Sequence, residues 1–330
     1  MTHSPLIDPA HEAHIHLLDL IDDVGIDGAL FERMSMPSVK DEDWKYTRLS
    51  ALFKTKFQRI KYMGNLPVLL GQPDWYALGT VVCFIDGLFS SEYSTPQAEW
   101  TKGLTLALTR TTEHQITDAF HSLAYASAHS GMSLKIAAGR VIEKPIILLN
   151  LGQQSNGLYS LRHQVVLGAQ ARVTLIEVCV GADAQLALSQ LDIQVGRNAQ
   201  FTHLLWQDGA DSAFSFGWRS VELARDARFM QRSLLMGNLI SRQQLFVSMN
   251  GANAEADVAS GVLGLGNQTQ DLRTHIRHAT ANARSRQWHR FALTDQANGV
   301  FHGDIKVEKG ADKTDADMAT HNLLLSPKAQ

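Results

Sequence analysis

A short histidine cluster near the N-terminus could in principle bind a metal ion. His11, Glu12 and His14 resemble the zinc-protease motif, in which two histidines bind zinc and a glutamate between them acts as the base. That motif places its histidines four positions apart on one face of a helix, whereas His11 and His14 are three apart. No third ligand is identifiable from the sequence. We therefore expect no metal site at this end of the chain.

A second group of ionisable side chains gathers towards the C-terminus. Five of the 14 histidines follow Gln270: His275, His278, His289, His302 and His321. Around the first two, apolar and charged residues alternate, which predicts a strand with an inward and an outward face. The inward positions are Leu272, Thr274, Ile276 and His278, and the outward positions are Asp271, Arg273, His275 and Arg277. A solvated charged face, which discourages unwanted strand pairing, is the favoured interpretation. A partner surface or a metal-handling strip is the alternative.

Acid–base chemistry would need a pair of carboxylates, as in the β-helix enzymes that degrade pectin. Four aspartates lie close together near the end of the chain: Asp304, Asp312, Asp315 and Asp317. No pair among them stands out by spacing, and such enzymes are usually secreted. A polysaccharide-processing enzyme therefore stays an alternative, which activity on a glycan would reveal.

The remaining reactive groups are few. Cys83 and Cys179 cannot supply the four thiolates of an ordinary iron–sulfur cluster, and we expect both to be small buried residues. No Gly-Lys dipeptide occurs, so the sequence has no P-loop for nucleotide phosphates. We therefore expect a chain that is not an enzyme and that holds no cofactor or metal by itself.

Composition restricts the class of protein further. The 330 residues are 45% hydrophobic and 19% charged, with a formal charge of −3, which is unlike a disordered chain or a nucleic-acid-binding domain. No apolar run approaches the roughly 18 residues that span a bilayer, and Met1–Leu20 lacks the basic start of a signal peptide. We expect a cytoplasmic protein whose partners are neither nucleic acids nor membranes.

A repeat organises the second half of the chain. A turn of small residues ending in alanine recurs at a nearly constant spacing in the sequence. These marker alanines are Ala171, Ala199, Ala227, Ala254, Ala283 and Ala311. Five consecutive intervals, each within one position of about 28, are hard to assign to chance, so the sequence predicts an array of structural repeats.

Each repeat reads as a strand, a tight turn and a second strand. Two residues spaced by two precede each marker, as in Val165/Leu167 and Ile193/Val195, and this spacing puts both on one strand face. A short all-β unit cannot bury that face alone, whereas stacked units form a continuous core. The sequence therefore predicts a mainly β chain that forms a β-helix with coils of about 28 residues. A propeller or an antiparallel sandwich is the competing architecture, but common propeller blades need about 40–50 residues.

The first part of the chain has a different pattern. Residues 1–80 are predicted to form a mainly helical N-terminal region, and residues 81–330 the β-helix core. Val81–Ile85 predicts a strand, followed by an Asp86-Gly87 turn and Leu88-Phe89. A helical insertion is expected at about residues 111–130, followed by Gly131 as its C-terminal cap.

Several motifs resemble the SufD family. The most specific are the terminal Val300–Val307, Lys313-Thr314-Asp315-Ala316 and Asn322–Ser326 segments and the N-terminal Asp43-Trp44-Lys45-Tyr46-Thr47 signature. Weaker matches are Gln270-Asp271 with Thr274, His278 and Ser285-Arg286-Gln287 in the preceding coil, and Asp86–Phe89, Glu143–Ile146 and Ile176-Glu177. The resemblance runs from about residue 30 to the end. The sister family SufB shares the core, but the Lys-Thr-Asp-Ala and Trp-Lys-Tyr-Thr segments favour SufD.

The resemblance implies a non-catalytic scaffold subunit of the SUF machinery for iron–sulfur cluster assembly. It implies a right-handed parallel β-helix that pairs with a SufB-like subunit and an ATPase like SufC. An iron–sulfur cluster would then be held by the complex and not by this chain alone. In the family the chain continues past the Leu-Leu-Leu-Ser segment into an Asp-Asp-Val-x-Cys-Ser-His-Gly segment, which carries the cluster-proximal cysteine and histidine. A helical domain with the SufC contact is part of the same continuation, and the resemblance indicates that both are absent here.

The partner interface is expected at the last coil. Stacked coils leave edge strands there, whose unpaired amides invite strand addition from SufB or from a second copy of the chain. The residues predicted to supply this edge are Phe301, Asp304, Lys306, Asn322, Leu323 and Leu325. A homodimeric interaction protein unrelated to clusters remains a further alternative.

Overall fold

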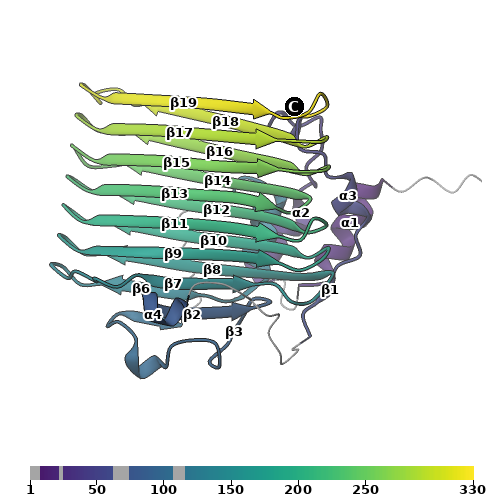
Figure 1. Cartoon of the computed structure of the whole chain (residues 1–330), viewed down its shortest axis with the longest axis horizontal. Coiled ribbons are helices and arrows are strands. Elements are labelled where there is room, and N and C mark those ends of the chain that lie inside the picture. Colours follow the sequence, from purple (N-terminus) through teal and green to yellow (C-terminus); the bar gives the residue numbers. More distant parts are fainter. Residues whose placement is uncertain (1–7, 22–24, 62–73, 107–115) are drawn as a thin grey trace, which may run out of the picture.

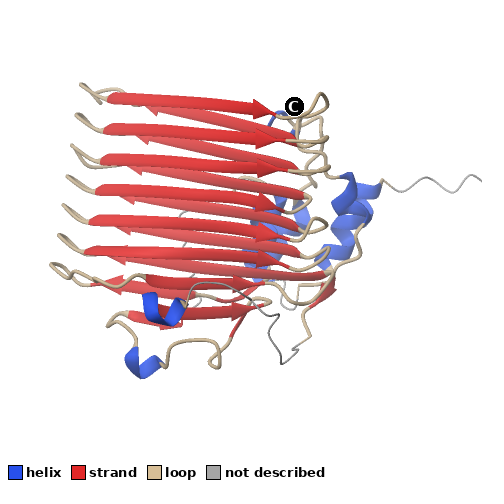
Figure 2. Cartoon of the chain, viewed as in Figure 1, coloured by secondary structure: helices blue, strands red, loops and turns tan. Residues whose placement is uncertain are grey.

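Most of the chain forms a flattened solenoid of stacked strands (Figure 1). The computed structural model describes residues 8–21, 25–61, 74–106 and 116–330. Two sheets run the length of the stack, and the helices lie outside them (Figure 2). The mainly β parallel solenoid predicted from the sequence repeat is thereby confirmed.

The first sheet contains alternate strands of the coils. Its members are β4 (Leu104–Leu106), β5 (Ala128–Ser130), β6 (Met132–Ile136), β8 (Gly157–Leu167), β10 (Leu186–Val195), β12 (Phe214–Leu223), β14 (Ile240–Met249), β16 (Thr269–His278) and β18 (Asn298–Val307), with β1 (Gln58–Arg59) beside β8. Pairing is parallel except between β4 and β6. Leu186 pairs with Phe214, which lies one coil later in the chain.

The second sheet contains the return strand of each coil. Its members are β2 (Thr80–Ile85), β3 (Leu88–Phe89), β7 (Ile146–Leu151), β9 (Arg172–Gly181), β11 (Gln200–Gly209), β13 (Arg228–Gly237), β15 (Glu255–Gly264), β17 (Arg284–Leu293) and β19 (Asp315–Leu324). β2 and β3 form the antiparallel hairpin predicted around Asp86-Gly87, and the other pairs are parallel.

The marker alanines explain how the chain turns from one sheet to the other. All six are at most 5% exposed, since each methyl group packs inside a corner of the solenoid. The residue before each marker has a positive φ: Gln170, Asn198, Asp226, Asn253, Asn282 and Gly310. Asn, Asp and Gly adopt this left-handed backbone at low cost, so the repeated small-residue turn encodes a repeated corner.

The solenoid interior holds the largest apolar cluster. The residues four and six positions before each marker turn inward, as Val165, Leu167, Ile193 and Val195 do at no more than 2% exposure. At the last coil the equivalent residues lose this cover, and Val307 is 52% exposed. Among the described residues, no further coil covers these positions.

Helices cover part of the outer face of the first sheet. They are α1 (Pro9–Leu18), α2 (Gly25–Arg33), η1 (Glu42–Trp44), α3 (Ser50–Lys54) and α5 (Ala119–Ala126), while α4 (Trp75–Leu78) and η2 (Gln97–Glu99) lie elsewhere. Phe120 of α5 packs on Phe216 of β12, with ring centroids 4.7 Å apart. α5 is shorter than the insertion expected at 111–130, because Ala128–Ser130 form β5; residues 111–115 lie outside the described residues.

The alternating faces predicted for β16 are present, but the outward row is not solvated along its whole length. Asp271 and Arg273 are only 2% and 3% exposed. The N-terminal segment covers them: Thr47 Oγ1 donates to Asp271 Oδ2 at 2.6 Å, and Arg273 Nη1 bonds Asp43 Oδ1 at 3.0 Å. The favoured interpretation of this row was therefore wrong at these two positions, because sequence alternation does not show which outward face another segment covers.

Asp271 is the centre of this docking contact. Its carboxylate accepts from Arg242 Nη1 at 2.9 Å and from Arg273 Nε at 3.1 Å. The Arg242 guanidinium also lies over the Trp44 ring, 3.8 Å from its centroid. Trp44 and Thr47 belong to the signature segment noted in the sequence, so that segment attaches the N-terminal layer to the solenoid.

Replacing Asp271 should release this layer. Asp271→Asn leaves two buried arginines without their shared carboxylate, so the free energy of unfolding should fall by about 3–5 kcal/mol. Limited proteolysis should then cut the N-terminal layer faster than in the unmodified protein, and the urea midpoint should fall. Asp226→Asn, at a partly exposed turn where asparagine also tolerates positive φ, serves as the matched control. Equal protease resistance of the two variants would contradict the docking role.

Candidate functional site

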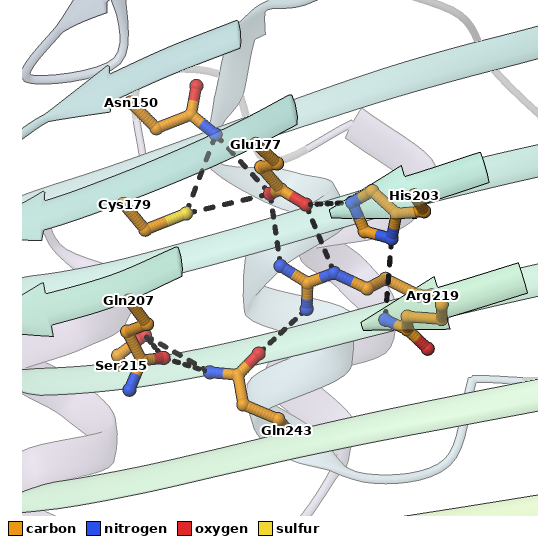
Figure 3. Close-up of polar contacts among 9 residues, drawn as sticks. Asn150, Glu177, Cys179, His203, Gln207, Ser215, Arg219 and Gln243 are labelled. Carbon is orange, nitrogen blue, oxygen red and sulfur yellow. Dashed lines mark hydrogen bonds and ion pairs between the residues drawn. The ribbon is translucent and has the colours of Figure 1, made fainter. Parts of the chain in front are cut away.

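A charged cluster lies inside the solenoid, where the coil pattern otherwise places apolar side chains (Figure 3). Glu177 of β9, His203 of β11 and Arg219 of β12 all point inward and are at most 3% exposed. Burying an ionised group costs several kcal/mol unless a partner compensates it. The geometry around Glu177 supplies that compensation.

Glu177 and Arg219 form a bidentate ion pair. Arg219 Nε lies 3.1 Å from Glu177 Oε2, and Arg219 Nη2 lies 3.0 Å from Oε1. Burial alone would raise the pKa of Glu177, but the Arg219 charge and the His203 hydrogen bond outweigh it and hold that pKa well below its usual range. Glu177 is therefore ionised, and the pair is neutral as a unit.

His203 is neutral, and its neighbours define its tautomer. Burial lowers the pKa of His203 below its usual value. Nε2 must donate to Glu177 Oε2, 3.0 Å away, because that carboxylate can only accept. Nδ1 is then the acceptor for the Gln231 amide at 3.3 Å. The imidazole on β11 thus connects Glu177 on β9 to Gln231 on β13, its neighbours on either side in the second sheet.

Further side-chain hydrogen bonds extend from the ion pair in two directions. On one side Arg219 Nη1 donates to Gln243 Oε1 at 2.7 Å, and Gln243 Nε2 donates to Gln207 Oε1 at 2.6 Å. On the other side Cys179 Sγ lies 3.6 Å from Glu177 Oε1 and 3.8 Å from Asn150 Nδ2. Cys179 is therefore part of a polar network and not the small apolar residue that was expected, whereas Cys83 is fully buried.

This network is suited to structure more than to covalent chemistry. Burial, together with the Glu177 charge, raises the pKa of the Cys179 thiol far above its usual range. Burial raises the pKa of Cys83 to about 12. Since the thiolate is the form that attacks or binds metals, neither thiol is activated in this fold. The cluster instead connects strands of successive coils by hydrogen bonds, from β7 to β14.

Sequence reasoning did not single out this network. The inward series Val173, Leu175, Glu177, Cys179 contains one carboxylate at a position that alternation assigns to the core. This charged residue among inward-facing positions was the signal in the sequence that could have indicated a buried polar network. Its partner Arg219 lies on a different coil and in the other sheet, and only the stacking register brings the two together.

The predicted interface residues lie on the last coil. In the part of the chain that the structure describes, β18 pairs only with β16 and β19 only with β17, so both are edge strands. Leu323 and Leu325 are 58% and 61% exposed. Phe301 points inward and its ring lies 4.7 Å from that of His289. The structure thus places the six residues on one open coil but divides them between its two sheets and its interior.

The charged members of this set have local partners. Lys306 Nζ lies 2.9 Å from Glu308 Oε1, and Asp304 Oδ2 lies 3.9 Å from His275 Nδ1. His275 also stacks on Phe246, with centroids 4.8 Å apart. Asn322 is exposed beside Phe291 of β17. Whether these residues contact a partner stays a prediction.

The other candidate clusters are dispersed by the fold. Asp304 lies on β18, whereas Asp315 and Asp317 lie on β19 beside arginines of β17, so these carboxylates do not share one cleft. At the N-terminus, Glu12 pairs with Lys56, and His14 bonds the carbonyl of Phe31. Within the described ranges, no group of three or more His, Cys, Asp or Glu side chains is arranged to hold a metal. None of the helices described is long and apolar enough to cross a membrane.

Removing Arg219 should destabilise the protein strongly. Arg219→Ala leaves Glu177 buried and unpaired, so we expect a loss of about 3–5 kcal/mol in the free energy of unfolding, measured by urea denaturation. The double variant Glu177→Gln/Arg219→Met removes both charges and should recover most of the loss. Arg228→Ala, which breaks an exposed pair with Glu255, should cost less than about 1 kcal/mol. A cost for Arg219→Ala as small as that of Arg228→Ala would contradict the assigned role.

Buried histidines should make stability depend on pH. Burial lowers the pKa of His163 and of His289 to about 4, so between pH 6.5 and 4 the unfolded chain binds protons that the folded chain does not. Stability should therefore be highest above pH 6.5 and should fall with decreasing pH, by about 2–3 kcal/mol per histidine. Urea midpoints measured from pH 8 to pH 4.5 test this, and His163→Gln should give a shallower decline. A midpoint that stays constant from pH 7 to pH 5 would disprove it.

The sequence matches a known protein family over more than half of its length. A family model described as "SUF system FeS cluster assembly, SufBD core domain" matches residues 150–330. The iron–sulfur cluster assembly protein SufD of Escherichia coli is 27% identical over 312 residues, which cover 90% of this chain and 72% of that protein. An iron–sulfur cluster assembly SufBD family protein of Synechocystis is 24% identical, covering 91% and 72%.

The SufD protein of Bacillus subtilis is similar over a shorter stretch. It is 24% identical over 229 residues, which cover 66% of this chain and 50% of that protein. The region that the family model matches, residues 150–330, coincides with the stacked coils from β8 onwards. It includes Glu177, Arg219 and the open terminal coil. The chain therefore belongs to the SufBD core family, as a member of its SufD branch.

Proposed function

We propose that this chain is a non-catalytic scaffold subunit of iron–sulfur cluster assembly in the SUF system. In this role it pairs with a SufB-type β-helix subunit and works with a SufC-type ATPase. The observation that carries the proposal is the open last coil. Its two edge strands, β18 and β19, are long, and each leaves one row of backbone groups unpaired by the strands described.

Such an edge is well suited to strand addition. Unpaired amides and carbonyls on a long edge strand form hydrogen bonds readily with another strand, and natural proteins cover or block edges that have no partner. Here apolar side chains accompany the edge: Leu323, Leu324 and Leu325 are all more than half exposed. A second β-helix that stacks on this coil would satisfy the backbone and bury these leucines together.

The chemistry of the chain supports a cluster held by the assembly and not by this chain alone. Both thiols have raised pKa values, and they lie in separate environments, Cys83 in an apolar cluster and Cys179 in the Glu177 network. Neither is offered at the open coil. Cluster ligands at that coil would therefore come from other residues of the complex.

Charges placed on the open coil should abolish partner binding. The N-terminally tagged chain is co-expressed with the SufB-type and SufC-type proteins of the same genome and purified without oxygen. The unmodified chain should recover both proteins. Leu323→Asp/Leu325→Asp should weaken this recovery at least tenfold, because two carboxylates cannot be buried unpaired against another coil.

Leu234→Asp is the matched control. Leu234 is also an exposed leucine, at 42%, but lies on β13, three strands from the edge. This variant should recover both partners normally. If the unmodified chain elutes as a dimer of itself without either partner, or if the edge variant binds as well as the control, the proposal is wrong.

A further inference from the structure

The polar interior does not end at the Glu177 network. Along the second sheet the register places Ser233 of β13 beside Ser260 of β15, Ser260 beside His289 of β17, and His289 beside Thr320 of β19. All of these positions face inward, and the two serine hydroxyls lie 2.8 Å apart. Neighbouring strands are about 4.8 Å apart, so the four side chains form a continuous polar seam that reaches the open coil.

A small cavity, lined in part by Ser233, Ser260 and Thr274, adjoins this seam. The space within it that the centre of a water molecule can occupy is about 10 Å³. Leucine and valine side chains form part of its wall, and the polar residues that line it are Arg219, Gln231, Ser233, Gln243, Gln244, Ser260 and Thr274. That volume is about the minimum that holds one water molecule, and a water needs two to four polar partners, which this lining provides.

Several polar atoms in and beside the seam have no hydrogen-bond partner among the residues that the structure describes. Thr274 is fully buried, and its hydroxyl makes no hydrogen bond to another residue. His289 is fully buried too, yet neither ring nitrogen has a partner; nor do Gln287 Oε1 and Thr320 Oγ1. Buried polar groups in native folds are nearly always hydrogen-bonded to protein or to ordered water, so a native fold rarely keeps several unsatisfied groups together.

We propose that ordered water occupies this seam, with one molecule bound in the cavity to the Thr274 hydroxyl and further water beside His289. Water is the ligand class that the site favours. Arg219 already has its counter-ion in Glu177, so the cavity has no excess positive charge for an anion. His289 is held neutral by burial, with one ring nitrogen donating and the other accepting. A small neutral molecule that both donates and accepts satisfies all of these groups.

The bound water has a structural consequence. It extends the hydrogen-bonded interior from the Glu177–Arg219 pair, past Thr274, towards the coil on which Phe301 and Thr320 lie. The last coils are then held to the stack by polar contacts as well as by apolar packing. Loss of the water would loosen that end of the solenoid first.

Replacing Thr274 distinguishes bound water from an empty cavity by the direction of the effect. Thr274→Val keeps the shape of the side chain and removes the hydroxyl. If water is bound, the variant loses a water-mediated hydrogen bond, and the folding equilibrium constant from urea denaturation should fall about fivefold to tenfold. If the cavity is dry, removing an unsatisfied hydroxyl should leave the constant unchanged or raise it, and the proposal is overturned.

Two further variants and a crystal structure complete the test. Thr47→Val, which removes a hydroxyl bonded directly to Asp271, should lower the constant in either case and so calibrates the measurement. A crystal structure of the full chain should show water density within hydrogen-bond distance of the Thr274 hydroxyl and of a ring nitrogen of His289. Thr274→Ser should retain the first density and Thr274→Val should lose it. Absence of both densities in the unmodified protein would refute the proposal even if no variant folds.

Discussion

Hydrogen bonding between parallel strands in a fixed register is the constraint on which this molecule depends. Each strand from β8 to β19 pairs residue by residue with the strand one coil away, so a shift of one residue would turn every inward side chain outward. Each corner must therefore place the next strand in the same register on the coil before it. Left-handed residues followed by a buried alanine achieve this, and the coil length stays nearly constant as a result.

The same register decides where charge can be buried. Glu177 and Arg219 belong to different sheets, and they meet because their coils stack with inward faces opposed. Asp271 performs a similar task on the outer face, where it holds two arginines against the N-terminal segment. Ion pairs of this kind contribute little net stability compared with apolar packing, but losing one partner is costly. We infer that they fix which coil lies next to which element.

The open end follows from the same repetitive architecture. A solenoid has no intrinsic stop, so its last coil exposes core positions and unpaired backbone unless something covers them. In this SufBD family member the final coil carries exposed leucines and no described strand beyond it. The proposed assembly with another β-helix would cover both, and the proposed water in the seam would hold that end to the stack.

The sequence by itself determined the parts that repeat or are local. The alanine spacing and the alternation before each marker predicted the solenoid, and the Asp86-Gly87 turn predicted a local pair of strands, because turn chemistry and strand faces are encoded within a few residues. Only the tertiary structure decided which distant side chains meet. The burial of Asp271 by Thr47, the place of Cys179 in the Glu177 network and the cavity at Thr274 depend on stacking between coils and on a covering segment from the opposite end of the chain. Local patterns carry no information about such contacts, since the same alternation suits a solvated face and a covered one.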